Sequence, residues 1–111
     1  MKRYESADPW VEQFMREALP KIKEFLNPQL VVIFGSRLKG EGTEESDIDV
    51  IVVSDFFREK PFLGRMPMML RMLHFPLSVD FLCYTPEEFK KIKTDSIIVQ
   101  EALREGLEVP L

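Results

Sequence analysis

Residues 47–53, with the sequence DIDVIVV, form a run that is too apolar for a strand with one face in water. Side chains of a strand alternate between its two faces, so Ile48 and Val50 share one face while Ile51 and Val53 share the other. A strand that is apolar on both faces has to be covered on both faces. The chain is therefore expected to form a layered fold in which helices lie on two sides of a sheet.

Two further strands and several helices are predicted around this strand. Residues 30–34 are a β-branched run that ends at a Gly-Ser turn, and residues 77–84 form a third apolar run. The sequence patterns predict helices over residues 8–26, 61–73, 86–93 and about 95–104. Helix caps are expected at Asp8, Thr85 and Gly106, and helix breaks at Pro20 and Pro67. The alternation predicts an α/β fold with a small three- or four-stranded sheet, in a single domain over residues 1–111.

Charge and hydropathy narrow the classes of partner. The chain has 19 acidic and 15 basic residues and a net charge of −4, so a long nucleic acid is not expected as a partner. No segment approaches the 18 apolar residues of a membrane span, and the N-terminal MKRYESADPW lacks the apolar part of a secretion signal. We therefore expect a cytoplasmic protein without membrane contact. The single cysteine, Cys83, lies in an apolar run and is expected to be a buried side chain.

Two carboxylates interrupt the apolar run at residues 47–53. Asp47 and Asp49 are two residues apart, so both side chains point to one face, with their β-carbons about 7 Å apart. Ionised carboxylates near a core repel each other and lose hydration, which destabilises a fold that leaves them unpaired. The nearest basic residues, Lys39 and Arg58, lie in flanking loops. Divalent cations, which take oxygen ligands, are therefore the expected partners.

A third carboxylate repeats this anomaly in the next apolar run. Asp80 is the only charged residue between His74 and Glu87. Strands that are adjacent in sequence are usually neighbours in a sheet, so Asp80 is expected to meet the pair at Asp47 and Asp49. Three carboxylates at one place predict a magnesium site of the kind used in phosphoryl transfer.

A candidate phosphate site precedes the acids. Gly35 and Ser36 follow a strand directly and open a predicted helical turn, so backbone N–H groups and the Ser36 hydroxyl are expected to point at a ligand beyond the strand. Gly35 lets the backbone approach that ligand closely. Arg37 and Lys39 either add positive charge to the site or are solvated surface cations.

The segment GSRLKGEGTEESDIDV, residues 35–50, resembles the signature of the DNA polymerase β-like nucleotidyltransferase superfamily. In that signature Gly-Ser is followed at this spacing by Asp-x-Asp, and Asp80 stands in the position of the third acid. The resemblance covers about residues 10–108 and implies the polymerase β-like fold, a small mixed sheet with helices packed on it. The short length and the tail at residues 80–109 resemble the minimal nucleotidyltransferases, which are partners of HEPN-domain proteins in prokaryotic toxin–antitoxin pairs.

The resemblance also implies the roles of individual residues. The catalytic residues, which are also the metal ligands, would be Asp47, Asp49 and Asp80. They would hold two Mg²⁺ ions, for which Mn²⁺ can substitute, and Asp80 would help to deprotonate the attacking hydroxyl. Gly35 and Ser36 would bind the distal phosphates of ATP or another nucleoside triphosphate, and Arg37 is assigned to the same nucleotide site. The hydroxyl attacks the α-phosphorus and pyrophosphate leaves.

The acceptor is expected on another chain, because 111 residues leave no room for a second, substrate-binding domain. In the family that acceptor is a HEPN toxin, which the resemblance makes the expected partner of this chain as an antitoxin. One alternative is transfer to a small molecule such as an aminoglycoside, with a pocket completed by a second copy of the chain in a homo-oligomer. Another is a non-catalytic antitoxin that only docks on its partner.

Overall fold

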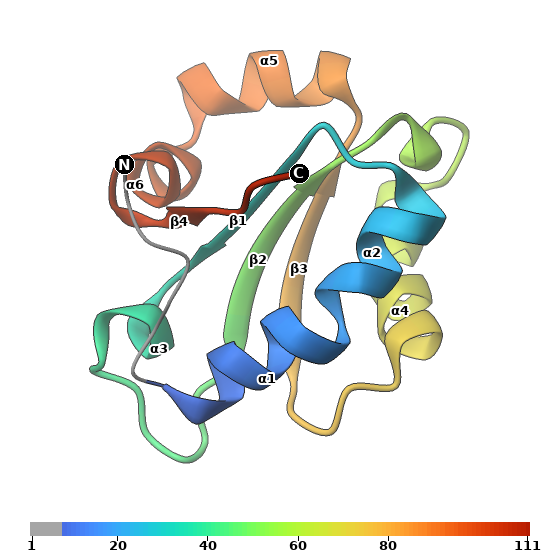
Figure 1. Ribbon diagram of the computed structural model, residues 1–111. Coiled ribbons are helices and arrows are strands. Elements are labelled where there is room, and N and C mark those ends of the chain that lie inside the picture. The colour runs from blue at the N-terminus through green and yellow to red at the C-terminus, as the bar shows by residue number, and fades with distance from the viewer. Residues whose placement is uncertain (1–7) are drawn as a thin grey trace.

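The computed structural model describes residues 8–111, in which four strands form one sheet in the order β3-β2-β1-β4 (Figure 1). The strands are β1 (Leu30–Phe34), β2 (Ile48–Val53), β3 (Val79–Tyr84) and β4 (Leu107–Glu108). β1 runs antiparallel to β2 and β4, whereas β2 and β3 are parallel. The mixed sheet confirms the predicted α/β fold. Residues 1–7, on which the expectation of a chain without a secretion signal partly rested, lie outside the described residues.

The helices agree with the sequence patterns, including the break at Pro20, but not the break at Pro67. They are α1 (Pro9–Glu17), α2 (Leu19–Leu26), α3 (Ser36–Lys39), α4 (Phe62–Leu73), α5 (Pro86–Asp95) and α6 (Ile97–Glu105), with a 3₁₀ turn at Asp55–Phe57. The predicted helix over residues 8–26 is split, because Pro20 lacks the N–H that an unbroken helix would need. Pro67 does not break α4 although it lacks a backbone N–H, and its exposed ring lies outside the core.

Gly106 caps the end of α6, as predicted, and its backbone N–H donates to the Ala102 carbonyl. Its φ of −80° and ψ of 176° are extended, so the chain leads directly into β4. A β-carbon at Gly106 would lie 2.8 Å from the carbonyl oxygen of Ile33 in β1. The glycine is therefore needed for close packing against the sheet as well as at the helix end.

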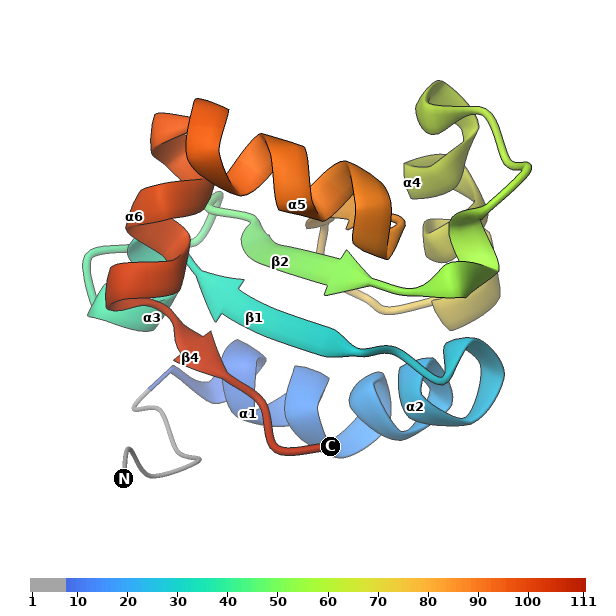
Figure 2. The same ribbon diagram turned by 90° about the horizontal axis from the view of Figure 1, so that it is seen from above.

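Helices cover both faces of the sheet, as the apolar strands predicted. Figure 2 shows α1 and α2 on one side of the sheet and α5 and α6 on the other. Alternate residues of β2 pack in two hydrophobic cores, one on each face of the sheet. Val50 belongs to the core with α1, α2 and α4, whereas Ile51 belongs to the core with α5 and α6. Both side chains are fully buried. This alternation fixes the face on which each residue of β2 lies.

The composition-based expectations concern Cys83 and membrane contact. Cys83 is 1 % exposed, and burial raises the pKa of its thiol to about 12, so the thiol is unreactive. Within residues 8–111, no helix combines the length and the apolar character that crossing a membrane would require.

Candidate functional site

Strand β2 and its neighbour, the edge strand β3, place the acids predicted from the sequence beside one another. Asp49 of β2 lies opposite Asp80 of β3, and neighbouring strands are about 4.8 Å apart. Asp47 directly precedes β2 and, two residues before Asp49, belongs to the same face. That face is the one covered further along by α5 and α6, because Ile51 on the same side of β2 packs in their core. Asp47 and Asp80 are exposed and Asp49 is half-buried.

No basic side chain in residues 8–111 forms an ion pair with any of these acids. Burial raises the pKa of Asp49 to about 6, and repulsion first from Asp80 and then from Asp47 adds to the increase. The electrostatic cost predicted for a pair of carboxylates in an apolar strand is therefore present.

The acids fit a divalent cation in their chemistry and position. Carboxylate oxygens are the ligands that Mg²⁺ prefers, and Asp49 and Asp80 start from opposed positions on adjacent strands. In their present rotamers, no three acidic, histidine or cysteine side chains of residues 8–111 converge closely enough to enclose an ion. A change of side-chain rotamer, which is a small rearrangement at exposed residues, is therefore part of any metal binding here.

Gly35 packs against the side chain of Asp49. Its φ of +90° lies in the region that favours glycine, and a β-carbon there would lie 3.0 Å from the Asp49 carboxyl carbon. The turn after β1 is thus in direct contact with the acid at the start of β2. Ser36 begins α3, is half-buried, and its hydroxyl has no hydrogen-bond partner in residues 8–111. This hydroxyl is available to a ligand beside Asp49.

Arg37 is neither a surface cation nor free to contact a ligand directly, in contrast to both sequence interpretations. Its side chain is 6 % exposed, and the guanidinium donates from Nε to the Ser46 carbonyl at 2.6 Å and from Nη2 to the Thr43 carbonyl at 2.8 Å. Nη1 donates to the Asp8 carboxylate at 3.0 Å. Arg37 therefore joins the cap of α1 to the loop that leads into Asp47.

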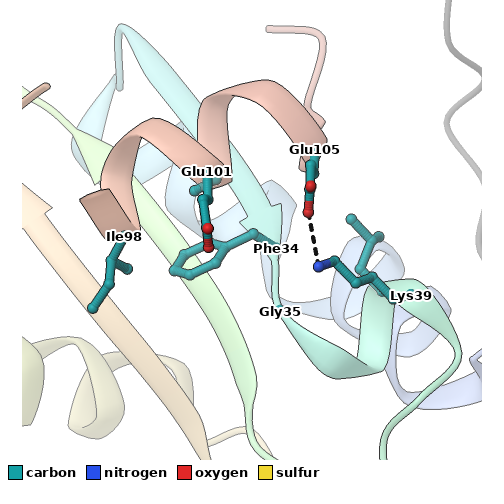
Figure 3. A pocket seen from close by; sticks show the side chains of 8 residues that line it. Phe34, Gly35, Lys39, Ile98, Glu101 and Glu105 are labelled. Carbon is teal, nitrogen blue, oxygen red and sulfur yellow. Dashed lines mark ion pairs between the residues drawn. The ribbon is translucent and has the colours of Figure 1, made fainter. Parts of the chain in front are cut away.

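A pocket of about 190 Å³ opens beside Gly35, between α3 and α6 (Figure 3). Lys39 of α3 reaches across it to Glu105 of α6, with 2.8 Å between Nζ and Oε1. This hydrogen bond and the charge of Glu105 raise the pKa of Lys39. Ile98 and Glu101 of α6 also line the pocket. The sequence offers no local signal for these α6 residues, because their position depends on α6 folding back over β1.

The fold and this arrangement of a Gly-Ser turn against paired acids define a nucleotidyltransferase-type domain. The sequence profile of the family described as the nucleotidyltransferase domain matches residues 15–110, and the chain belongs to that family. A presumed nucleotidyltransferase of Sulfolobus solfataricus is 29 % identical, with a TM-score of 0.53 over 84 % of this chain and 86 % of that one.

Other similarities concern the fold alone. The BolA domain of SufE1 from Arabidopsis thaliana is 21 % identical, with a TM-score of 0.54 over 68 % of this chain and 94 % of that one. BolA1 from the same plant is 20 % identical, with a TM-score of 0.53 over 67 % of this chain and 92 % of that one. No curated protein matches the chain at a significant level.

Proposed function

We propose that this chain is a metal-dependent enzyme that transfers AMP from ATP to a hydroxyl of a HEPN-domain toxin and thereby acts as its antitoxin. The observation that carries the enzymatic part is the group of Asp47, Asp49 and Asp80, which has no cationic partner in residues 8–111 and in which Asp49 lies against the turn at Gly35. Membership of the nucleotidyltransferase family supports the reaction class. The partner class is supported by the resemblance to minimal nucleotidyltransferases.

In this proposal the three acids hold the metal ions, two Mg²⁺ in the family to which the chain belongs. Bound Mg²⁺ would offset the charge of the triphosphate and stabilise the entering and leaving oxygens. Asp80 is an accessible acceptor for the proton of the attacking hydroxyl, because it is exposed on an edge strand. The hydroxyl oxygen bonds to the α-phosphorus, the bond to the bridging oxygen breaks, and pyrophosphate leaves with the electron pair.

The turn after β1 would bind the distal phosphates. Gly35 keeps the backbone open to the ligand, and the unpartnered Ser36 hydroxyl donates a hydrogen bond to a phosphate oxygen. Lys39 can exchange Glu105 for a phosphate, since an exposed ion pair is only weakly held. Arg37 acts indirectly in this scheme, by fixing the loop that leads to Asp47.

The acceptor is best supplied by another chain. In residues 8–111 every helix packs on the one sheet, and this part of the chain contains no second layered unit that could grip an acceptor. Asp80 is exposed, so a hydroxyl carried by a partner protein can approach it without a rearrangement of the fold.

The test is transfer of label from ATP labelled at the α-phosphate to a HEPN-domain protein, in Mg²⁺ and in EDTA. We expect Mg²⁺-dependent labelling of the partner, loss of toxin activity, and loss of both effects in Asp49→Asn. Asp55→Asn is the matched control, because Asp55 is an exposed acid just after β2 that pairs with Arg58. Neutralisation that survives in Asp49→Asn would show that docking alone is the function. Labelling of an aminoglycoside but of no protein would favour the small-molecule alternative.

A further inference from the structure

One region of the chain differs from the rest in its charge. The twenty residues 60–79 contain no Asp or Glu, although the whole chain has 19 acids in 111 residues. The same stretch holds four of the six methionines. Its charged residues are all basic, and Lys60 and Arg71 are accessible among them. Helix α4 makes up most of this stretch.

An apolar surface runs along the outer side of α4. It consists of Phe62 (50 % exposed), Leu63 (89 %), Met66 (37 %) and Leu70 (39 %), and is called here the apolar α4 surface. Met66 lies four residues after Phe62, three after Leu63 and four before Leu70, so these side chains share one side of the helix. The other side packs on the sheet, where Met69 is fully buried and Met68 and Met72 lie against the core, as expected of methionines that fill a core.

This surface is held rigidly. Arg65 lies beneath it, 5 % exposed, and donates from Nη1 to the carbonyl of Cys83 at 3.1 Å and to the carboxylate of Glu88 at 2.6 Å. Its Nε donates to the carbonyl of Lys60 at 2.9 Å. The start of α4 is thus fastened to the edge strand β3 and to α5. The exposure of the neighbouring Leu63 therefore belongs to the folded state and does not come from a fraying helix end.

The apolar α4 surface is continuous with Asp80. A groove of about 200 Å³ is lined by Phe62, Leu63 and Met66 from α4 and by Asp80 and Leu82 from β3. β3 is an edge strand, and α4 lies beside it (Figure 1). A molecule that covers the surface therefore also reaches the acid proposed to receive the proton of the acceptor.

We infer that the apolar α4 surface is the docking site of the acceptor protein, which presents an apolar helix flanked by carboxylates. The role of the docked partner as acceptor rests on the proposed function. The docking itself is inferred from the exposure and charge of the surface alone. The protein has a net charge of −4, but residues 60–79 contain no acid. An acidic partner is therefore favoured at this surface, because the stretch itself does not repel it. The partner's hydroxyl would lie at the Asp80 end of the groove.

Two other occupants fit less well. A symmetric dimer through this surface would set Lys60 and Arg71 of one copy near the same residues of the other, which places like charges together. An anionic membrane would also be attracted by these cations, but a flat lipid surface would not fill the groove of about 200 Å³ between α4 and β3, which a protein side chain can enter.

The experiment uses the full 111-residue chain and two synthetic helical peptides, one with a leucine stripe flanked by glutamates and one with lysines in place of those glutamates. Calorimetry should show binding of the acidic peptide and at least ~10-fold weaker binding of the basic one, and the methyl signals of Met66 and Leu70 should shift. Leu63→Glu should weaken the acidic peptide by at least ~10-fold, since it adds a like charge where an apolar contact was made. Ile97→Glu, at a residue of α6 that is 72 % exposed, is the matched control and should leave binding unchanged.

Equal binding of the two peptides, or an equal effect of Leu63→Glu and Ile97→Glu, would overturn the inference. So would binding to phosphatidylserine vesicles, or a dimer in sedimentation, that Leu63→Glu abolishes. Asp49→Asn separates the two proposals, because it should retain peptide binding. A parent that binds the peptide but shows no Mg²⁺-dependent ATP binding would refute the proposed function alone, and the reverse result would refute the docking surface alone.

Discussion

Asp49 of β2 and Asp80 of β3 occupy opposed positions on two parallel strands, and no cation of residues 8–111 pairs with either. Like charges directly opposite in a sheet destabilise it. The metal-free fold therefore carries repulsion that a bound cation or a proton on Asp49 would relieve. This electrostatic destabilisation is expected of residues kept for a functional site, because packing of the core does not need them.

Neutralising Asp49 should stabilise the metal-free protein. In EDTA at pH 8 we expect Asp49→Asn to melt about 4 °C above the parent, since ~1 kcal/mol corresponds to that shift in a domain of this size. The gain stays near ~1 kcal/mol because Asp49 is half-buried and solvent screens part of the repulsion. Thermal unfolding followed by circular dichroism measures it. A variant less stable than the parent would mean that the acids are separately solvated.

The gap in melting temperature between Asp49→Asn and the parent should depend on pH. The pKa of Asp49 is about 6 in the folded state and 3.8 for the isolated group, so the folded parent binds more protons between these values and loses stability as pH rises. The gap should be small at pH 4, widen between pH 4 and pH 6, and level off above about pH 7. An unchanged gap at pH 4 would assign the stabilisation to something other than this carboxylate.

Gly35→Ala should damage both the fold and the site. Alanine at residue 35 would have to adopt the φ of +90° that favours glycine, and its β-carbon would press on the Asp49 carboxylate. We expect this substitution to lower the free energy of unfolding by about 2 kcal/mol and to abolish Mg²⁺-dependent ATP binding. Gly64→Ala is the matched control, because nothing lies within 4 Å of its β-carbon in α4. That variant should gain about 0.5 kcal/mol from helix propensity and bind ATP normally. Chemical unfolding and calorimetry would measure both.

Arg37→Lys should destabilise the protein although it keeps the charge. An ammonium group cannot donate in the fixed fork that reaches Thr43, Ser46 and Asp8 together, so the part-buried carbonyls of Thr43 and Ser46 lose partners, at a cost of about 2 kcal/mol. Urea unfolding measures the loss. Lys39→Ala is the control and should leave stability unchanged while weakening binding of ATP. Equal stability of Arg37→Lys and the parent would show that the loop does not depend on this network.

Local patterns predicted the strands and the acids but not the contacts between distant segments. The apolar runs of β1, β2 and β3 follow from burial on both faces of the sheet, and each acid stood out because an apolar strand excludes unpaired charge. The burial of Arg37 could not be predicted, because its partner Asp8 lies 29 residues away and the local sequence resembles an exposed loop. β4 was missed because two residues carry no period.

Ser36→Ala should weaken triphosphate binding much more than monophosphate binding. The hydroxyl lies in the turn beside Gly35, where the distal phosphates are proposed to bind, and it has no partner in residues 8–111 that its loss would leave unsatisfied. A lost hydrogen bond to a charged group costs about 1.5 to 3 kcal/mol, which corresponds to roughly a 10- to 150-fold weaker Kd. Calorimetry with Mg²⁺ and either a non-hydrolysable ATP analogue or AMP measures both ligands. Ser78→Ala, at an exposed serine before β3 whose side chain is also unpartnered in the described residues, is the matched control. An equal loss of affinity for the two ligands would remove Ser36 from the phosphate site.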